Sequence, residues 1–88
     1  MKITYSPKFK KSYKKLFDNE KLAIKNAVSK LSKEPLLGDL KKGDLVWLRV
    51  YKIKIKTHEF LIGYSFDGNN LILYSLGTHE NFYRNLKR

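Results

Sequence analysis

Three lysines occupy alternate positions in the segment Tyr51–Lys56, which reads Tyr-Lys-Ile-Lys-Ile-Lys. On a β-strand successive side chains point to opposite faces, so Lys52, Lys54 and Lys56 would share one face. Their ammonium groups would then lie about 6.6–7 Å apart, twice the rise per residue. Phosphates along an extended nucleic-acid strand are separated by a similar distance, roughly twice the 3.4 Å per-strand charge spacing of a stacked duplex. The lysine row is therefore a candidate phosphate track, although lysines also protect edge strands from aggregation.

A histidine and two aromatic residues follow close to the C-terminus, at His79, Phe82 and Tyr83. Histidine is well suited to proton transfer near neutral pH, but a lone histidine is more often structural or solvated. His58 is a weaker candidate because we expect it in a hairpin turn. Aromatic rings can stack on unpaired RNA bases. We assign Phe82 to the core and Tyr83 to the site.

The charge balance favours a polyanionic partner. The 88 residues contain 19 Lys+Arg and 8 Asp+Glu, a formal net charge of +11. Such a surface attracts nucleic acid first and an acidic protein second. The alternative is that the lysines serve only solubility.

Several classes of protein are disfavoured by composition. The absence of cysteine excludes disulfides and thiolate metal sites, and two histidines alone cannot form a structural zinc site. No metal or other cofactor is expected. No run of about 18 apolar residues is present, and the first residues do not resemble a signal peptide. We therefore expect a single domain over residues 1–88 with a cytoplasmic location.

The residues up to Pro35 predict one strand and two helices. Lys2–Tyr5 is expected to be a short strand, and Ser6-Pro7 is typical of a helix start. Asp18-Asn19 should end the first helix and cap a second one over about Glu20–Lys33. Pro35 stops that helix. The following residues, Leu36–Asp44, are expected to form a loop.

After residue 44 the periodicity changes to that of strands. The expected elements are strands at Leu45–Lys56, Glu59–Phe66 and Leu71–Leu76, turns at Thr57-His58 and Asp67–Asn70, and a short helix or turn over His79–Arg88. These elements predict an α+β fold, a two-layer sandwich. The N-terminal strand and an antiparallel helix hairpin pack on a mainly antiparallel four-stranded sheet. The other face of the sheet would be open to solvent and available for a ligand.

The chain resembles the RelE/ParE superfamily of bacterial type II toxins over nearly all of its length. The strand Tyr51–Lys56 is similar to the lysine-bearing strand of RelE-like toxins. The closing segment Gly77-Thr78-His79-Glu80-Asn81-Phe82-Tyr83-Arg84-Asn85-Leu86-Lys87-Arg88 is the most specific match, because many RelE-like toxins end in G-(S/T)-H-E-N-F-Y-R-(D/N)-L-K-R.

The resemblance implies a ribosome-dependent endoribonuclease, an mRNA interferase that needs no metal. It implies catalytic roles for four residues: Lys52, Lys54, His79 and Tyr83. Further contacts to RNA are expected from Arg49, Lys56, Glu59 and Arg84. It also implies a cognate acidic antitoxin, with mRNA and the ribosome as the other partners and no contact with a membrane.

One departure from the family pattern bears on the chemistry. RelE has an arginine on the strand after the lysine-bearing one, where this chain has Leu61. Stabilisation of the phosphorane charge would then depend on Arg49, Lys56 or Arg84. Lysines held close together disfavour each other's charge, so Lys52 or Lys54 could act as base, with Glu59 as a rival and His79 as the acid. The sequence leaves these assignments open.

Two other functions fit the same resemblance. The first is a ParE-like inhibitor that binds DNA gyrase without hydrolytic chemistry, against which the segment from His79 to Tyr83 argues. The second is an inactive relative that only binds its antitoxin.

Overall fold

The computed structural model describes residues 2–41 and 47–86, with side chains as far as residue 82. Its elements are β1 (Lys2–Tyr5), α1 (Pro7–Lys14), α2 (Asp18–Lys33), the 3₁₀ turn η1 (Pro35–Leu37), β2 (Asp39–Leu40), β3 (Arg49–Ile55), β4 (His58–Asp67), β5 (Asn70–Thr78) and α3 (His79–Leu86). The α+β class predicted from the sequence is confirmed. None of the helices within these ranges is long and apolar enough to cross a membrane.

Hydrogen bonds to side chains stabilise the first turns of the two N-terminal helices. Ser6 Oγ accepts a hydrogen bond from the Phe9 amide at 3.0 Å and donates one to the Tyr74 carbonyl at 2.7 Å, so this cap also ties α1 to β5. The second helix begins at Asp18, two residues earlier than expected. Its N-cap is Phe17, whose amide donates to Glu20 Oε1 at 2.9 Å, because a glutamate at the third helical position can satisfy the capping amide.

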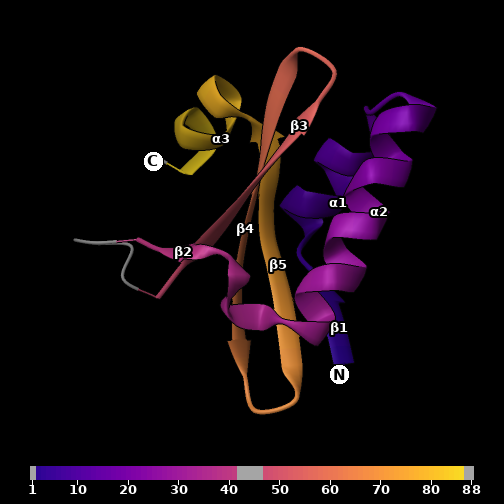
Figure 1. The fold of residues 1–88 in the computed structure, drawn as a ribbon. Helices are drawn as coiled ribbons and strands as arrows, with labels where there is room; N and C mark the ends of the chain where they lie inside the picture. Colours follow the sequence, from indigo (N-terminus) through magenta and orange to yellow (C-terminus); the bar gives the residue numbers. More distant parts are fainter. Residues whose placement is uncertain (1, 42–46, 87–88) are drawn as a thin grey trace.

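The sheet has five strands in the order β1-β5-β4-β3-β2. Strand β1 is parallel to β5, and the other neighbouring pairs are antiparallel. Our count of four strands was wrong because Asp39–Leu40, expected in a loop, pairs with Arg49 and Val50 of β3. Helices α1 and α2 lie against one side of this sheet and α3 lies on the other side (Figure 1).

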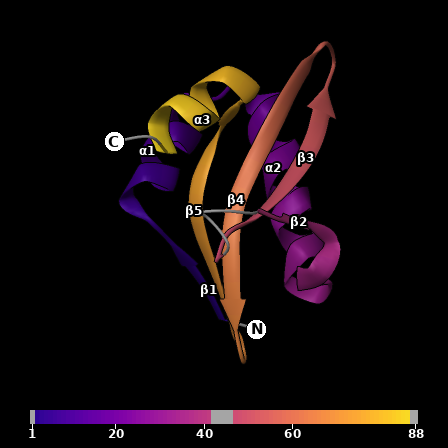
Figure 2. The same cartoon turned by 90° about the vertical axis from the view of Figure 1, so that its left-hand side faces the viewer.

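The hairpin between β3 and β4 turns one residue earlier than expected. Lys56 and Thr57 form the turn, and Lys56 has a φ of 57°, in the left-handed region. His58 is therefore not a turn residue but the first residue of β4, paired with Ile55. Strand β3 begins at Arg49 and not at the expected Leu45, because Trp47 and Leu48 lie outside the strand; residues 45 and 46 are not among the described ones. The turn and α3 lie at the same end of the sheet (Figure 2).

The main core lies between the sheet and the two N-terminal helices. Its helical members are Phe9, Ile24, Ala27, Val28 and Leu31, and its strand members are Phe60, Ile62, Tyr64, Leu71, Leu73 and Leu76. Ile53 and Ile55 pack against it, as their alternation with the lysines predicted.

The opposite face of the sheet carries a second, smaller core. Leu48, Val50 and Leu61 are buried there together with Phe82 of α3, and Tyr74 packs against them. Phe82 is thus a core residue as predicted. The expectation of a fully open face was wrong, because α3 folds back over β4 and β5 and covers part of it.

Candidate functional site

Lys52 and Lys54 lie on the face of β3 that bears the second core. Lys52 is paired with Leu61 of β4, which is itself paired with Gly77 of β5. Since directly paired residues share a face, and Leu61 belongs to the second core, both lysines point away from the N-terminal helices. Both side chains are exposed. The expected alternation of lysine and isoleucine is therefore present in the structure.

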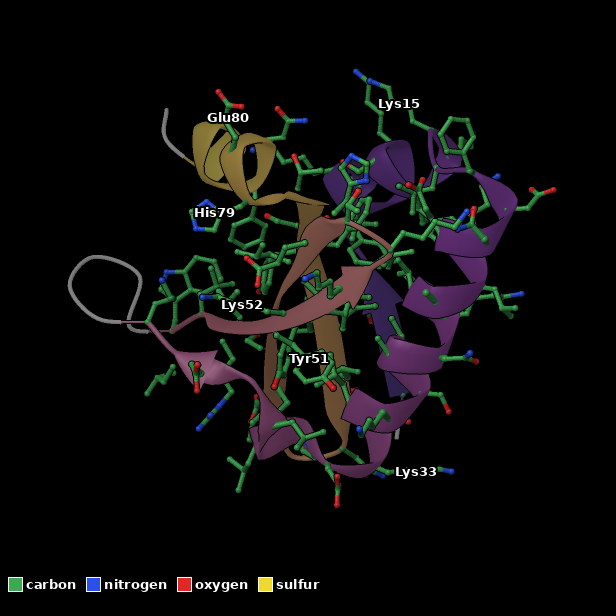
Figure 3. All side chains as sticks on the ribbon, turned by 45° about the horizontal axis from the view of Figure 1, so that its top comes forward. Lys15, Lys33, Tyr51, Lys52, His79 and Glu80 are labelled. Carbon is green, nitrogen blue, oxygen red and sulfur yellow. The ribbon has the colours of Figure 1, made fainter. Side chains whose placement is uncertain are left out.

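Glu59 and His79 lie at the same end of this face. Lys54 is paired with Glu59, and Phe60 is paired with Thr78. His79 directly follows Thr78 and begins α3, so it lies at the end of β5, beside the start of β4. Neighbouring strands are about 4.8 Å apart, so the two steps from β3 to β5 across this end of the sheet span about 10 Å. In Figure 3 the labelled side chains of Lys52 and His79 project from the same side of the molecule, on the side of α3.

The position of His79 depends on how α3 is held against the sheet. Phe82, three residues after His79, is 0% exposed and packs beside Leu48, Val50 and Leu61. Its ring lies over Gly63, where an added Cβ would be 2.8 Å from Phe82 Cζ. Real Cβ atoms do not approach other atoms so closely, so Gly63 provides the space in which Phe82 sits. The first turn of α3 is fixed by this contact.

Leu61 is buried beneath the same contact. It is 0% exposed and belongs to the cluster around Phe82. A longer, charged side chain at this position could reach the surface only if Phe82 moved. Leucine is therefore the residue that the packing of α3 in this chain favours.

The structure does not bring all the predicted residues together. Arg49 is paired with Tyr64 on the helix-bearing face, opposite to Lys52 and Lys54, and this corrects our expectation that it joins them. Its guanidinium donates to the Gly38 carbonyl at 2.8 Å and lies 5.7 Å from the centre of the Phe66 ring. Lys56 lies in the hairpin turn rather than on the strand. The side chains of Tyr83 and Arg84 lie outside the described ones.

Arg49 belongs to a polar cluster with Tyr64, Pro35 and Gly38 that the sequence did not reveal. The buried Tyr64 hydroxyl donates to the Pro35 carbonyl at 2.6 Å and accepts from the Gly38 amide at 2.8 Å. Burial raises the pKa of this hydroxyl, although the hydrogen bond from Gly38 opposes the shift. This cluster fixes the segment between α2 and β2 against the sheet.

Trp47 is a second feature that sequence reasoning missed. It is 48% exposed and contacts Tyr74 edge to face, with ring centres 4.9 Å apart and ring planes at 72°. Tyr74 packs against the second core, so both rings lie on the face that bears Lys52. A lone tryptophan beside a strand was the available signal in the sequence.

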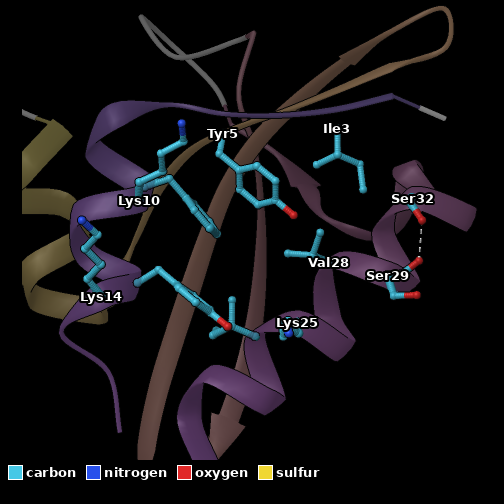
Figure 4. Close-up of a pocket in the computed structure, with 11 residues that line it drawn as sticks. Ile3, Tyr5, Lys10, Lys14, Lys25, Val28, Ser29 and Ser32 are labelled. Atoms are coloured by element: carbon cyan, nitrogen blue, oxygen red, sulfur yellow. Dashed lines mark hydrogen bonds between the residues drawn. The ribbon is translucent and has the colours of Figure 1, made fainter. Parts of the chain in front are cut away.

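A separate apolar groove lies between β1, α1 and α2. Its volume is about 530 Å³. Ile3, Tyr5 and Val28 line it, and lysines from both helices stand around it, at positions 10, 14 and 25 (Figure 4). The groove opens beside β1, an edge strand of the sheet. It is built from different elements than the sheet face that carries Lys52 and Lys54. Within the described ranges, no group of three metal-ligating side chains is found.

Comparison with known proteins identifies relatives. A sequence model described as the ParE-like toxin of type II bacterial toxin–antitoxin systems matches residues 3–87. The chain is similar to a chain of the intact E. coli RelBE toxin–antitoxin complex (TM-score 0.69, 17% identity, 86% of this chain and 93% of that one). It is also similar to the isolated E. coli RelE toxin (TM-score 0.67, 17% identity, 99% and 96% covered).

A third solved structure is that of the conserved hypothetical protein HP0894 from Helicobacter pylori (TM-score 0.55, 26% identity, 91% and 96% covered). A search of the curated proteins gives no match. At 17% identity the likeness to RelE concerns the fold, and the family rests on the sequence model.

Proposed function

The chain belongs to the ParE-like toxins of type II bacterial toxin–antitoxin systems, within the RelE/ParE superfamily, and we propose that it is a ribosome-dependent endoribonuclease that cleaves mRNA. The observation that carries this proposal is the gathering of Lys52, Lys54, Glu59 and His79 at one end of one sheet face. These residues supply acids, bases and cations at the ends of three neighbouring strands, whose spacing spans about 10 Å, the scale of two adjacent nucleotides. The reaction that such a set suits is transesterification at a phosphodiester.

The proposed reaction begins with removal of the proton from a ribose 2′-hydroxyl. Lys52, Lys54 or Glu59 takes this proton, and the 2′-oxygen attacks the adjacent phosphorus. The bond to the 5′-oxygen breaks, His79 donates a proton to that leaving oxygen, and a 2′,3′-cyclic phosphate remains. The remaining ammonium groups stabilise the charge of the phosphorane. Because Leu61 is buried and Arg49 faces the other way, this last role falls to the lysines. Tyr83 is proposed to stack on a base, and Lys56 and Arg84 to contact the RNA backbone.

The proposal is tested by mapping mRNA 5′ ends after induction of the protein. We expect cuts confined to translated regions and in register with codons. His79→Ala combined with Tyr83→Ala, or Lys52→Ala alone, should lower cleavage by about 10²–10⁴-fold while leaving the fold unchanged by circular dichroism. Lys33→Ala, at the end of α2, is the matched control and should keep full activity. A double variant that remains fully toxic would exclude this site.

Inhibition of DNA gyrase by binding is the second candidate, because the matching family is described by its likeness to ParE. Plasmid supercoiling in arrested cells separates the two functions. Lost supercoiling with intact mRNA would favour the inhibitor. Expression without any growth defect would instead indicate an inactive relative that binds only its antitoxin.

The partner that we propose is a small acidic antitoxin, encoded by a neighbouring reading frame and acting in the cytoplasm. Its binding site is proposed to be the apolar groove between β1, α1 and α2. The groove offers apolar side chains for an amphipathic segment, and the surrounding lysines match an acidic one.

A further inference from the structure

We propose that Trp47 and Tyr74 form a stacking platform for one unpaired base of the RNA substrate, beside the lysine row. The inference rests on the proposed function, because it assigns a further subsite to the same face. It concerns recognition of the substrate rather than the chemical step.

The geometry of the two rings suits one base. Tyr74 is half buried against the second core, which fixes its ring, and Trp47 stands on it edge to face. Perpendicular contact leaves at least one face of the indole uncovered, consistent with its 48% exposure. Burial of an aromatic ring contributes more than that of most side chains, so an indole left half exposed is available for a ligand. Aromatic rings held in this way are the usual stacking partners of single-stranded bases.

The distance from the lysine row fits a short stretch of RNA. Trp47 is five residues from Lys52, and because it lies in a turn before β3 begins, the separation is less than the length of about 17 Å that a fully extended chain would span. Two nucleotides of an extended strand span a similar distance, taking roughly twice the 3.4 Å charge spacing of a stacked duplex for each. A phosphate held by Lys52 would thus place a base about two nucleotides away at Trp47.

The surroundings favour a nucleic acid over a protein segment. Trp47 lines neither the groove between β1, α1 and α2 nor the two smaller pockets lined by Ser12 and Leu76, whereas a protein partner usually inserts its anchoring side chains into such a cavity. The indole stands on a surface instead, on the same face as two exposed lysines. A flat ring beside a row of cations matches the alternation of base and phosphate in a single strand.

Trp47 is the only tryptophan of the chain, so its fluorescence reports directly on this site. The probe is a six-nucleotide 2′-O-methyl RNA, which binds but cannot be cleaved. We expect it to quench the indole emission, because base stacking quenches indole fluorescence. An abasic strand of equal length, inorganic polyphosphate and poly-glutamate should leave the emission nearly unchanged. Equal quenching by the abasic strand or by polyphosphate overturns the proposal, and equal quenching by poly-glutamate assigns the rings to an acidic protein segment instead.

Binding of the same RNA with a fluorescein label provides a second measurement. Trp47→Leu should weaken binding about tenfold, and Trp47→Phe by less, because the phenyl ring retains part of the stacking. Leu40→Ala, which shortens another half-exposed apolar side chain, is the control and should have no effect. Unchanged binding by Trp47→Leu would contradict the platform.

The outcome is separable from that of the proposed function. If the protein does not cleave mRNA but the RNA still quenches Trp47, the platform stands and the endoribonuclease proposal fails. If cleavage of mRNA depends on Lys52 and His79 but RNA does not quench the fluorescence of Trp47, the platform alone fails.

Discussion

At the scale of single residues, Tyr64 shows how one buried polar group organises a loop. Its hydroxyl donates a hydrogen bond to the Pro35 carbonyl and accepts one from the Gly38 amide. An added Cβ at Gly38 would be 2.7 Å from that hydroxyl. The tyrosine therefore requires glycine at position 38. Arg49 donates a hydrogen bond to the carbonyl of the same glycine, so this side chain helps to hold the loop in place.

Tyr64→Phe is expected to destabilise the protein by about 1–3 kcal/mol, because the Pro35 carbonyl and the Gly38 amide lose their partner. Urea denaturation at pH 7 measures this. Tyr51→Phe, which removes a hydroxyl from a half-buried position, should cost less. Equal effects of the two substitutions would show that the hydrogen bonds of Tyr64 contribute little.

The same residue predicts how stability depends on alkaline pH. Burial raises the pKa of Tyr64 above its ordinary value of 10.0. The folded state therefore favours the neutral phenol, and this contribution is present below about pH 10 and is lost as pH rises through the folded pKa. Tyr64→Phe should flatten this alkaline decline in the free energy of unfolding.

At the scale of elements, α3 is positioned by its contact with the sheet. The helix begins directly after β5, and its first turn is fixed where the Phe82 ring lies over Gly63. Because His79 precedes Phe82 by three residues, the packing of one aromatic ring determines where the proposed acid stands. The stability of this contact and the activity of the site are therefore coupled.

Gly63→Ala should displace Phe82 and with it the start of α3. We expect the free energy of unfolding to fall by about 1–3 kcal/mol, the usual cost of overpacking. The rate of RNA cleavage should fall by a larger fraction than the free energy of unfolding does. Ser65→Ala, on the same strand, is the control. Adding Phe82→Leu to Gly63→Ala makes room for the new methyl group and should restore part of the stability. No restoration by this pair would argue against a steric cause.

At the scale of the whole molecule, the basic chain presents two different surfaces. One is the sheet face with Lys52, Lys54 and His79, proposed for RNA. The other is the groove between β1, α1 and α2, proposed for the antitoxin. A net charge of +11 attracts both kinds of acidic partner over a long range, so shape must distinguish between them. An antitoxin that fills the groove would leave the RNA face to be covered by another of its segments.

Reversing the charge around the groove should separate neutralisation from toxicity. Lys14→Glu with Lys25→Glu is expected to weaken antitoxin binding at least tenfold while preserving growth arrest, because like charges then face an acidic segment. Growth with the co-expressed neighbouring reading frame, together with co-purification, measures this. Lys33→Glu is exposed on α2 but does not line the groove, and should leave neutralisation intact. Full neutralisation of the double variant would place the antitoxin elsewhere.

The sequence by itself determined the fold class, most of the elements and the lysine face. These follow from periodicity and capping, which are local: alternating Ile53 and Ile55 separate the lysines from the core, and Ser6-Pro7 starts a helix. The closing segment also indicated the family, which the match over residues 3–87 confirms.

Only the tertiary structure decided which residues meet across the sheet. The register pairs Lys54 with Glu59, sets Thr78, the residue before His79, beside Phe60, and turns Arg49 to the other face, while packing buries Leu61 beneath Phe82. The short strand Asp39–Leu40 and the contact of Trp47 with Tyr74 were hidden for the same reason. Pairing between segments far apart in the chain depends on long-range packing, and a pattern of neighbouring residues does not encode it.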